Sequence, residues 1–119
     1  MYNVFIITPD GSVTHTTQEK KPDYAQIKEA VGGIIETIPL FKTFIHQGKK
    51  YLRGTAYCFE EGRMRGQARN RKAIVAWYEA TGALDNSNYC LDRMELYGDV
   101  IFYAKEPEVK KVNIKEGTS

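Results

Sequence analysis

The chain has only two cysteines among 119 residues, Cys58 and Cys90, and it has no Cys-x-x-Cys or His-x-x-x-His spacing. The absence of these spacings argues against a structural zinc site, and so few cysteines argue against a disulfide framework. Neither His15 nor His46 lies at metal-ligand spacing from a cysteine. We therefore expect reduced thiols, no metal and no cofactor.

Long apolar runs are also missing. No stretch approaches the ~20 residues that a membrane-spanning helix needs. The apolar start MYNVFII has no basic residues before it and meets Pro9–Asp10 too soon for a signal peptide. The sequence therefore predicts a soluble protein of the cytoplasm with no membrane partner. Its length and its 42% hydrophobic content fit one domain with a buried core.

A strong excess of one charge is absent as well, since the net charge is only +2. Of 17 basic and 15 acidic residues, five and two lie within residues 60–72, which leaves 12 and 13 elsewhere. This one segment therefore carries a local charge of +3 while the rest of the chain carries −1. The mild total argues against a general nucleic-acid coat, and the local excess marks the segment as the candidate site.

The residues that are present predict an α+β fold. Two stretches have helical spacing and glycine stops, residues 22–32 and residues 70–81, the second with Asn70 as N-cap and Ile74, Trp77 and Tyr78 on one face. Segments rich in β-branched and aromatic residues predict strands at 2–8, 13–17, 34–41, 42–47, 51–59 and 91–104. We expect a single domain over residues 1–104, with a mostly antiparallel sheet and both helices packed on one face.

Some features of this arrangement stay open in the sequence. Gly98–Asp99 fits either a hairpin turn or, as we prefer, a glycine bulge in one longer strand. Residues 105–119 have few apolar side chains and alternating charge, which predicts a loosely held tail. Strands 2–8 and 34–41 are apolar at consecutive positions, and Pro39 favours a sheet edge. Because exposed apolar edges tend to pair, we expect a homodimer.

The basic segment reads EEGRMRGQARNRK from Glu60 to Lys72, directly before the second predicted helix. Cations at a helix N-terminus oppose its partial positive charge, unless an anion binds there together with the unpaired N–H groups. The neighbouring glycines would let a ligand or partner approach the backbone closely. The alternative is that these side chains are solvated or pair with Glu60, Glu61 and Glu79. The candidate binding residues are Arg63, Arg65, Arg69, Asn70, Arg71 and Lys72.

Catalytic patterns are weak by comparison. Adjacent Glu60 and Glu61 point to opposite sides of a strand end and would not converge on one substrate. Cys58 and His46 have no spacing that fixes them together as nucleophile and base, and a strand cysteine is more often part of a core. Trp77 fits either the core or an interface. We therefore expect no enzymatic activity.

Three short blocks carry a resemblance to a known family. They are AVGGIIETIPL at Ala30–Leu40, EEG followed by a glycine and Asn-Arg at Glu60–Arg71, and GDV at Gly98–Val100. In this order the blocks resemble a small family of bacteriophages and mobile elements that is catalogued as a domain of unknown function. The resemblance implies a phage accessory protein that acts in the cytoplasm of an infected bacterium.

Together these observations predict a non-enzymatic accessory protein that binds and modulates a host target through the Arg-rich segment. The target is a host protein with an acidic surface or a phosphate-bearing ligand, since both require clustered arginines. The alternative is a nucleic-acid or nucleotide-binding protein that uses the same arginines together with exposed tyrosines.

Overall fold

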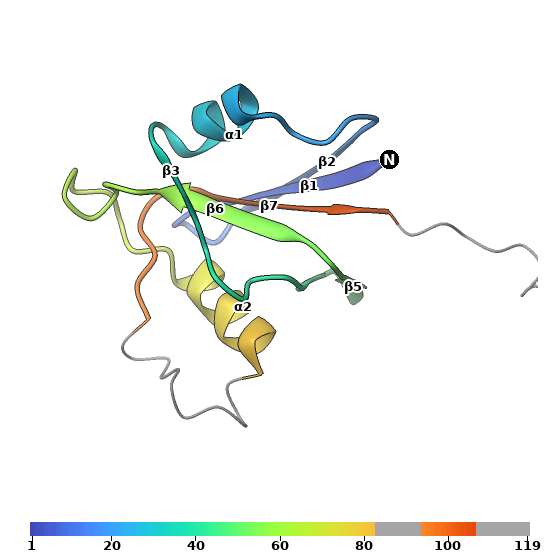
Figure 1. Ribbon diagram of the computed structural model, residues 1–119. Helices are drawn as coiled ribbons and strands as arrows, with labels where there is room; N and C mark the ends of the chain where they lie inside the picture. The colour runs from blue at the N-terminus through green and yellow to red at the C-terminus, as the bar shows by residue number, and fades with distance from the viewer. Residues whose placement is uncertain (83–93, 107–119) are drawn as a thin grey trace, which may run out of the picture.

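The computed structural model of the protein describes residues 1–82 and 94–106, and it shows a single α+β domain (Figure 1). The main sheet has five antiparallel strands in the order β2-β1-β7-β6-β3, and a second sheet pairs β4 with β5. The strands are β1 (Tyr2–Ile7), β2 (Val13–Gln18), β3 (Ile35–Thr37), β4 (Phe44–His46), β5 (Lys49–Tyr51), β6 (Thr55–Phe59) and β7 (Val100–Lys105). The predicted fold class is therefore confirmed.

Both predicted helices are present. Helix α1 (Tyr24–Val31) is capped by Asp23, whose side chain accepts from the backbone N–H of Gln26, and it ends at Gly32 with φ 94°. Helix α2 (Arg71–Thr81) is capped by Asn70 and ends at Gly82 with φ 67°. Both ends use the left-handed conformation that glycine adopts without steric cost. The N-cap residues and the terminal glycines therefore allow both helices to be located from the sequence.

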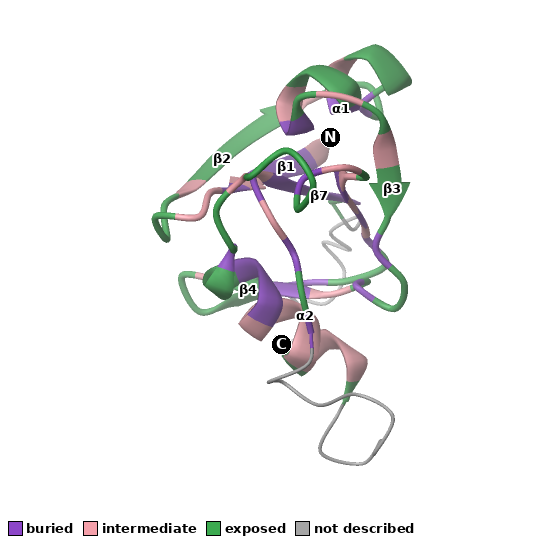
Figure 2. Cartoon of the chain, turned by 90° about the vertical axis from the view of Figure 1, so that its left-hand side faces the viewer, coloured by how far each residue is buried: buried purple, intermediate pink, exposed green. Residues whose placement is uncertain are grey.

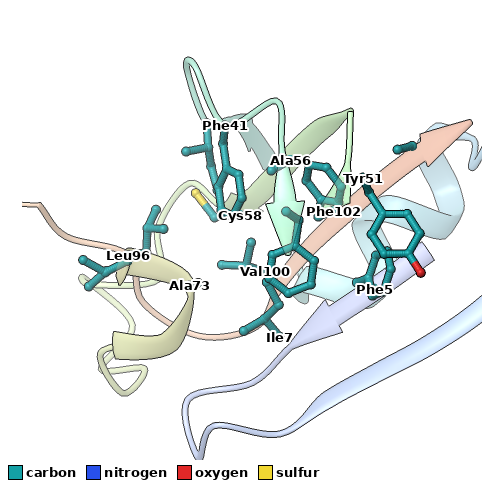
Figure 3. Close-up of a cluster of buried hydrophobic side chains, with 14 of the residues drawn as sticks. Phe5, Ile7, Phe41, Tyr51, Ala56, Cys58, Ala73, Leu96, Val100 and Phe102 are labelled. Carbon is teal, nitrogen blue, oxygen red and sulfur yellow. The ribbon is translucent and has the colours of Figure 1, made fainter. Parts of the chain in front are cut away.

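The two helices lie on opposite faces of the main sheet, so the expectation that both pack on one face is wrong (Figure 1). One face buries Val4, Ile101 and Tyr103 beneath Ile27 and Val31 of α1. The other buries a larger cluster that includes residues of α2 (Figure 3); among its members are Phe5, Ile7, Phe102, Ala73 and Ile74.

The cause is the lack of polar alternation in the central strands. In β1 and β7, Val4 lies opposite Tyr103 and Phe5 lies opposite Phe102, so successive apolar residues point to opposite faces. A strand that is apolar at consecutive positions must be covered on both sides. The consecutive apolar residues of β1 therefore reflect a central position, whereas β3 lies at one edge of the sheet.

The strand predicted over 51–59 is divided in two. Gly54 separates β5 from β6, and a Cβ atom there would lie 2.7 Å from the backbone oxygen of Tyr103 and would overlap the ring of Phe102. Its N–H donates to the oxygen of Lys42 at 2.8 Å. The break thus comes from a long-range approach of β7 and of the 38–43 segment, which local sequence does not reveal.

The strand predicted over 91–104 begins later than expected. Gly98 has φ 78°, Tyr97 bridges Arg69, and β7 starts only at Val100. At the other end, β7 extends to Lys105, which lies opposite Tyr2. Residues 107–119, most of the predicted tail, lie outside the described part of the chain, as does Cys90.

Trp77 lies at the border of the core. Its ring is half-buried against the cluster on the α2 face, and its Nε1 donates to the backbone oxygen of Pro39 at 2.7 Å. Along its length α2 is mostly buried or half-buried, whereas much of α1 is exposed (Figure 2).

Candidate binding surface

Residues 60–67 form a compact turn with its tip directed away from the sheet. Successive backbone hydrogen bonds hold it, from Gly62 to Phe59, from Arg65 to Glu61, from Gly66 to Arg63 and from Gln67 to Gly62, at 2.9 to 3.1 Å. Gly66 adopts φ 75°, which lets the chain turn back toward α2. We refer to Arg63, Met64 and Arg65 as the tip.

Each tip arginine has one carboxylate neighbour. Arg63 Nη1 lies 2.7 Å from Glu95 Oε1, with the guanidinium 6.0 Å from the centre of the Tyr97 ring. Arg65 lies 3.1 Å from Glu61 Oε1, in the i,i+4 relation. The two arginine side chains remain 71% and 68% exposed. Exposed pairs of this kind contribute roughly 0–1 kcal/mol, so the arginines are oriented but accessible.

Arg69 and Asn70 are used by the fold itself. Arg69 Nη2 donates to the oxygen of Met94 at 3.1 Å. The Asn70 side chain is fully buried; its Oδ1 accepts from Ala73 N–H, and its Nδ2 donates to the oxygens of Ile7 and Gly98, both at 2.8 Å. Asn70 therefore ties α2 to β1 and to the start of β7, and it offers no surface to a ligand.

Arg71 and Lys72 begin α2 and are exposed. No described residue forms an ion pair with either of them, so the alternative in which they pair with Glu60, Glu61 or Glu79 is not realised within that part of the chain. Lys72 instead lies near His46 of β4. Burial, and then the charges of His15 and Lys72, hold the pKa of His46 below its ordinary value.

The three sequence blocks that carry the family resemblance meet at one place. Gly62 and Gly98 both lie against the side chain of Gln67 with no room for a Cβ atom, and a Cβ atom on Gly32 would lie 3.9 Å from Gln67 Nε2. Gly33 has no room for a Cβ atom because of the ring of Phe59, the residue directly before the second block. Gly98 N–H also donates to the oxygen of Ala68 at 2.8 Å. These glycines therefore allow the end of α1, the basic segment and the start of β7 to pack together.

Two shallow hollows flank this junction. One, of about 430 Å³, lies between the end of α1 and the tip and is lined by Lys28, Gly33, Phe59 and Arg65 among others. The second, of about 360 Å³, is lined by Glu29, Gln67 and Asp99 among others. Burial, and then the charge of Asp10, raise the pKa of Asp99. Both hollows are open, and the first places a recess directly beside Arg65.

The structure does not support Cys58 and His46 as a nucleophile and base. Cys58 is a buried free thiol in the cluster on the α2 face, where burial and then Glu36 raise its pKa to about 12. A thiol in that state is a poor nucleophile. Within residues 1–82 and 94–106, no three His, Cys, Asp or Glu side chains gather as metal ligands would.

The sequence interpretation named the tip arginines and the cations of α2 but missed two groups of neighbours. Glu95 pairs with Arg63 across 32 residues of sequence. His15 and His46 contact each other although they come from separate sheets. Strand alternation alone gives the face on which each side chain lies, whereas neither contact follows from local sequence.

Comparison of the chain with protein-family models, with curated proteins and with solved structures gave no match. Neither described helix has the length and apolar character needed to cross a bilayer.

Proposed function

We propose that the protein is a non-enzymatic binding protein whose tip docks on an acidic surface of another protein. One observation carries this proposal. Met64 is 84% exposed between two exposed arginines, whereas the other exposed large apolar side chains among the described residues lie between 45% and 57%. An apolar side chain flanked by arginines is the composition found at the centres of protein interfaces, where Met and Arg are enriched.

A protein partner fits this tip better than a nucleic acid. Glu61 and Glu95 lie within 3.1 Å of the tip arginines, so a polyanion would meet carboxylates at the same place as cations. Met64 adds no favourable contact with a phosphate backbone. A protein surface can place its own carboxylates beside Arg63 and Arg65 and an apolar recess over Met64, which satisfies all three side chains.

The setting that we propose is an infected bacterium. Here the support is the resemblance of Ala30–Leu40, Glu60–Arg71 and Gly98–Val100 to a phage family. In this proposal the protein acts in the host cytoplasm as an accessory factor and modulates one host protein by occupying its acidic surface.

The test is affinity capture from bacterial lysate with the tagged protein, before and after nuclease treatment. Wild type is compared with the double variant Arg63→Glu/Arg65→Glu, with Met64→Ala, and with the matched control Lys20→Glu/Lys21→Glu on the exposed segment before α1. We expect capture of one partner that persists after nuclease treatment. The lysine control should still capture it, the arginine variant should not, and Met64→Ala should capture less of it.

Two outcomes would contradict the proposal. Capture that disappears after nuclease treatment would make the protein a nucleic-acid binder, in line with the alternative considered from the sequence. Equal loss in the arginine variant and in the lysine control would show that only total charge matters.

A further inference from the structure

A second group of cationic and titratable side chains lies away from the tip, around the ring of Phe5. His15 of β2 stacks on Phe5 with ring centres 4.3 Å apart and planes at 18°. His46 of β4 meets the same ring edge-on at 5.3 Å, and the two histidine rings are 5.8 Å apart. Tyr51 of β5 packs on Phe5 at 4.8 Å (Figure 3). The ring of Phe5 therefore packs against both imidazole rings and restricts their orientation.

A buried amide orients one of these imidazoles. Asn3 is 4% exposed, and its Oδ1 lies 2.8 Å from His15 Nε2. A carbonyl oxygen at this distance favours the tautomer in which Nε2 carries the proton. The contact with Asn3 therefore fixes the orientation of the His15 ring and leaves its Nδ1 edge unoccupied by Asn3.

No described carboxylate balances this group of charges. The charged and titratable side chains that face His46 are His15 of β2, Lys72 of α2, and Lys49 and Tyr51 of β5, of which Lys49 is its cross-strand partner. Lys49 places its Nζ 5.3 Å from the centre of the Tyr51 ring. Neither of the ion pairs between described residues involves any of these side chains.

We propose that His15, His46 and Lys72 form a binding site for a dianionic phosphoryl group, such as that of a small phosphate monoester. Lys72 supplies a permanent charge from the start of α2. The two imidazoles supply N–H donors from two separate strands. The site is distinct from the tip and does not depend on the proposed docking of an acidic protein.

Binding and protonation are coupled at such a site. Burial, and then the charges of His15 and Lys72, hold the pKa of His46 below its ordinary value, so its charged form is disfavoured in the protein alone. A dianion supplies the missing opposite charge, which raises the pKa of His46 in the complex. By linkage, the anion binds more tightly as the pH falls through the histidine range, and its affinity declines toward pH 8.

Sulfate is the first probe, because its charge stays at −2 throughout this range and any pH dependence then belongs to the protein. We expect saturable shifts of the His15 and His46 ring resonances in NMR titrations of the full chain. The affinity should be about tenfold higher at pH 5.5 than at pH 8, which corresponds to a rise of about one unit, or about 1.4 kcal/mol, in the pKa of His46 on binding. Unsaturable shifts, or equal affinity at both values, would overturn the proposal.

Variants and a second pair of probes define the site. Lys72→Gln, an exposed position where the fold is preserved, should weaken sulfate binding several-fold, and His46→Gln should remove its pH dependence. Lys20→Gln is the matched control and should change nothing. At pH 7, where it is mostly a dianion, phenyl phosphate should bind more tightly than dimethyl phosphate, which has the single charge of a nucleic-acid backbone. The reverse order, or equal weakening by Lys20→Gln, would contradict a monoester site.

Discussion

At the scale of single residues, Asn70 shows how one side chain serves several elements. The sequence identified it as the cap of α2 from its type and position. The structure adds two buried hydrogen bonds, to the oxygens of Ile7 and Gly98, which join three parts of the chain. Its conformational role was predictable because caps are local, whereas its ties to β1 and Gly98 depend on the complete fold.

Replacement of Asn70 by Ala should destabilise the protein by about 2–4 kcal/mol. The change removes a helix cap, which contributes about 0.5–2 kcal/mol, and leaves two buried carbonyls without a donor, at about 1–3 kcal/mol. Asn70→Asp should be no more stable than the Ala variant, since it keeps the cap acceptor but turns a buried carboxylate oxygen toward the oxygens of Ile7 and Gly98. Urea unfolding measures both; a loss below about 0.5 kcal/mol in the Ala variant would refute the role assigned to Asn70.

Gly98 and Gln67 form a second pair that can be tested at this scale. A methyl group at Gly98 would overlap the Gln67 amide, and φ 78° is unfavourable for alanine. We expect Gly98→Ala to cost about 1–3 kcal/mol. Adding Gln67→Ala should recover only part of that cost, because the overlap disappears and the backbone strain remains. A double-mutant cycle in urea checks this; strict additivity would mean that the two residues do not collide.

At the scale of elements, some features of the fold are specified by local sequence and others by tertiary contacts. Helices α1 and α2 were predictable because their caps and glycine stops act within a few residues. The break between β5 and β6 was not, because it arises where Gly54 meets Phe102 of β7. The sides on which the helices pack were also missed, although the unbroken apolar runs of β1 and β7 already indicated a sheet that is covered on both faces.

The start of α2 provides a prediction for one element. Arg71→Glu/Lys72→Glu replaces cations by anions at the positive end of the helix, and it should raise stability at pH 8 by about 1 kcal/mol. Urea unfolding of this variant and of Lys20→Glu/Lys21→Glu checks it. A variant less stable than wild type at pH 8 would show that the two cations serve the fold.

The same variant should also change how stability depends on pH. The fold lowers the pKa of His46, so its charged form is disfavoured in the folded protein. Wild type therefore loses stability from this group as the pH falls below 6.5, the pKa of His46 in the unfolded chain. Removing Lys72 and adding carboxylates raises the pKa of His46, and the variant should therefore lose less stability between pH 8 and pH 5.5. Histidine NMR titration measures the pKa directly; an unchanged value would contradict the contact with Lys72.

At the scale of the whole molecule, the sheet is covered on both faces and open at its edges. Strand β3 forms one edge, and among the described strands it pairs with β6 alone. Because Ile34 and Ile38 form backbone bonds with the β6 segment, alternation directs the N–H of Thr37 outward. An edge of this kind is open to pairing with a second copy.

The homodimer expected from the sequence thus has a defined test. Light scattering at several concentrations should give a dimer mass for wild type and for Thr37→Val, which keeps the N–H. Thr37→Pro removes an outward donor and blocks the edge, and it should give a monomer with unchanged secondary structure. A monomeric wild type at high concentration would refute the dimer, and a dimeric Pro variant would place the contact elsewhere.

The candidate surface was also predictable only in part. Charge counting located Arg63 and Arg65, and the helix start located Arg71 and Lys72, because both features are contiguous in sequence. The carboxylate of Glu95 and the histidines around Phe5 reach these cations through the tertiary fold. The sequence therefore indicated where cations gather, whereas the structure shows which of them remain exposed.

The most direct test of the tip as a docking surface uses the two carboxylates that form ion pairs with its arginines. Glu61→Gln/Glu95→Gln frees Arg63 and Arg65 and removes repulsion toward an acidic partner, while Glu19→Gln/Glu106→Gln changes the net charge equally at other sites. The measurement is the amount of nuclease-resistant partner captured per molecule of each variant. We predict several-fold more capture by the Glu61/Glu95 variant than by wild type or the control. Unchanged or reduced capture by that variant would mean that the ion pairs serve the fold and that the tip is not the docking surface.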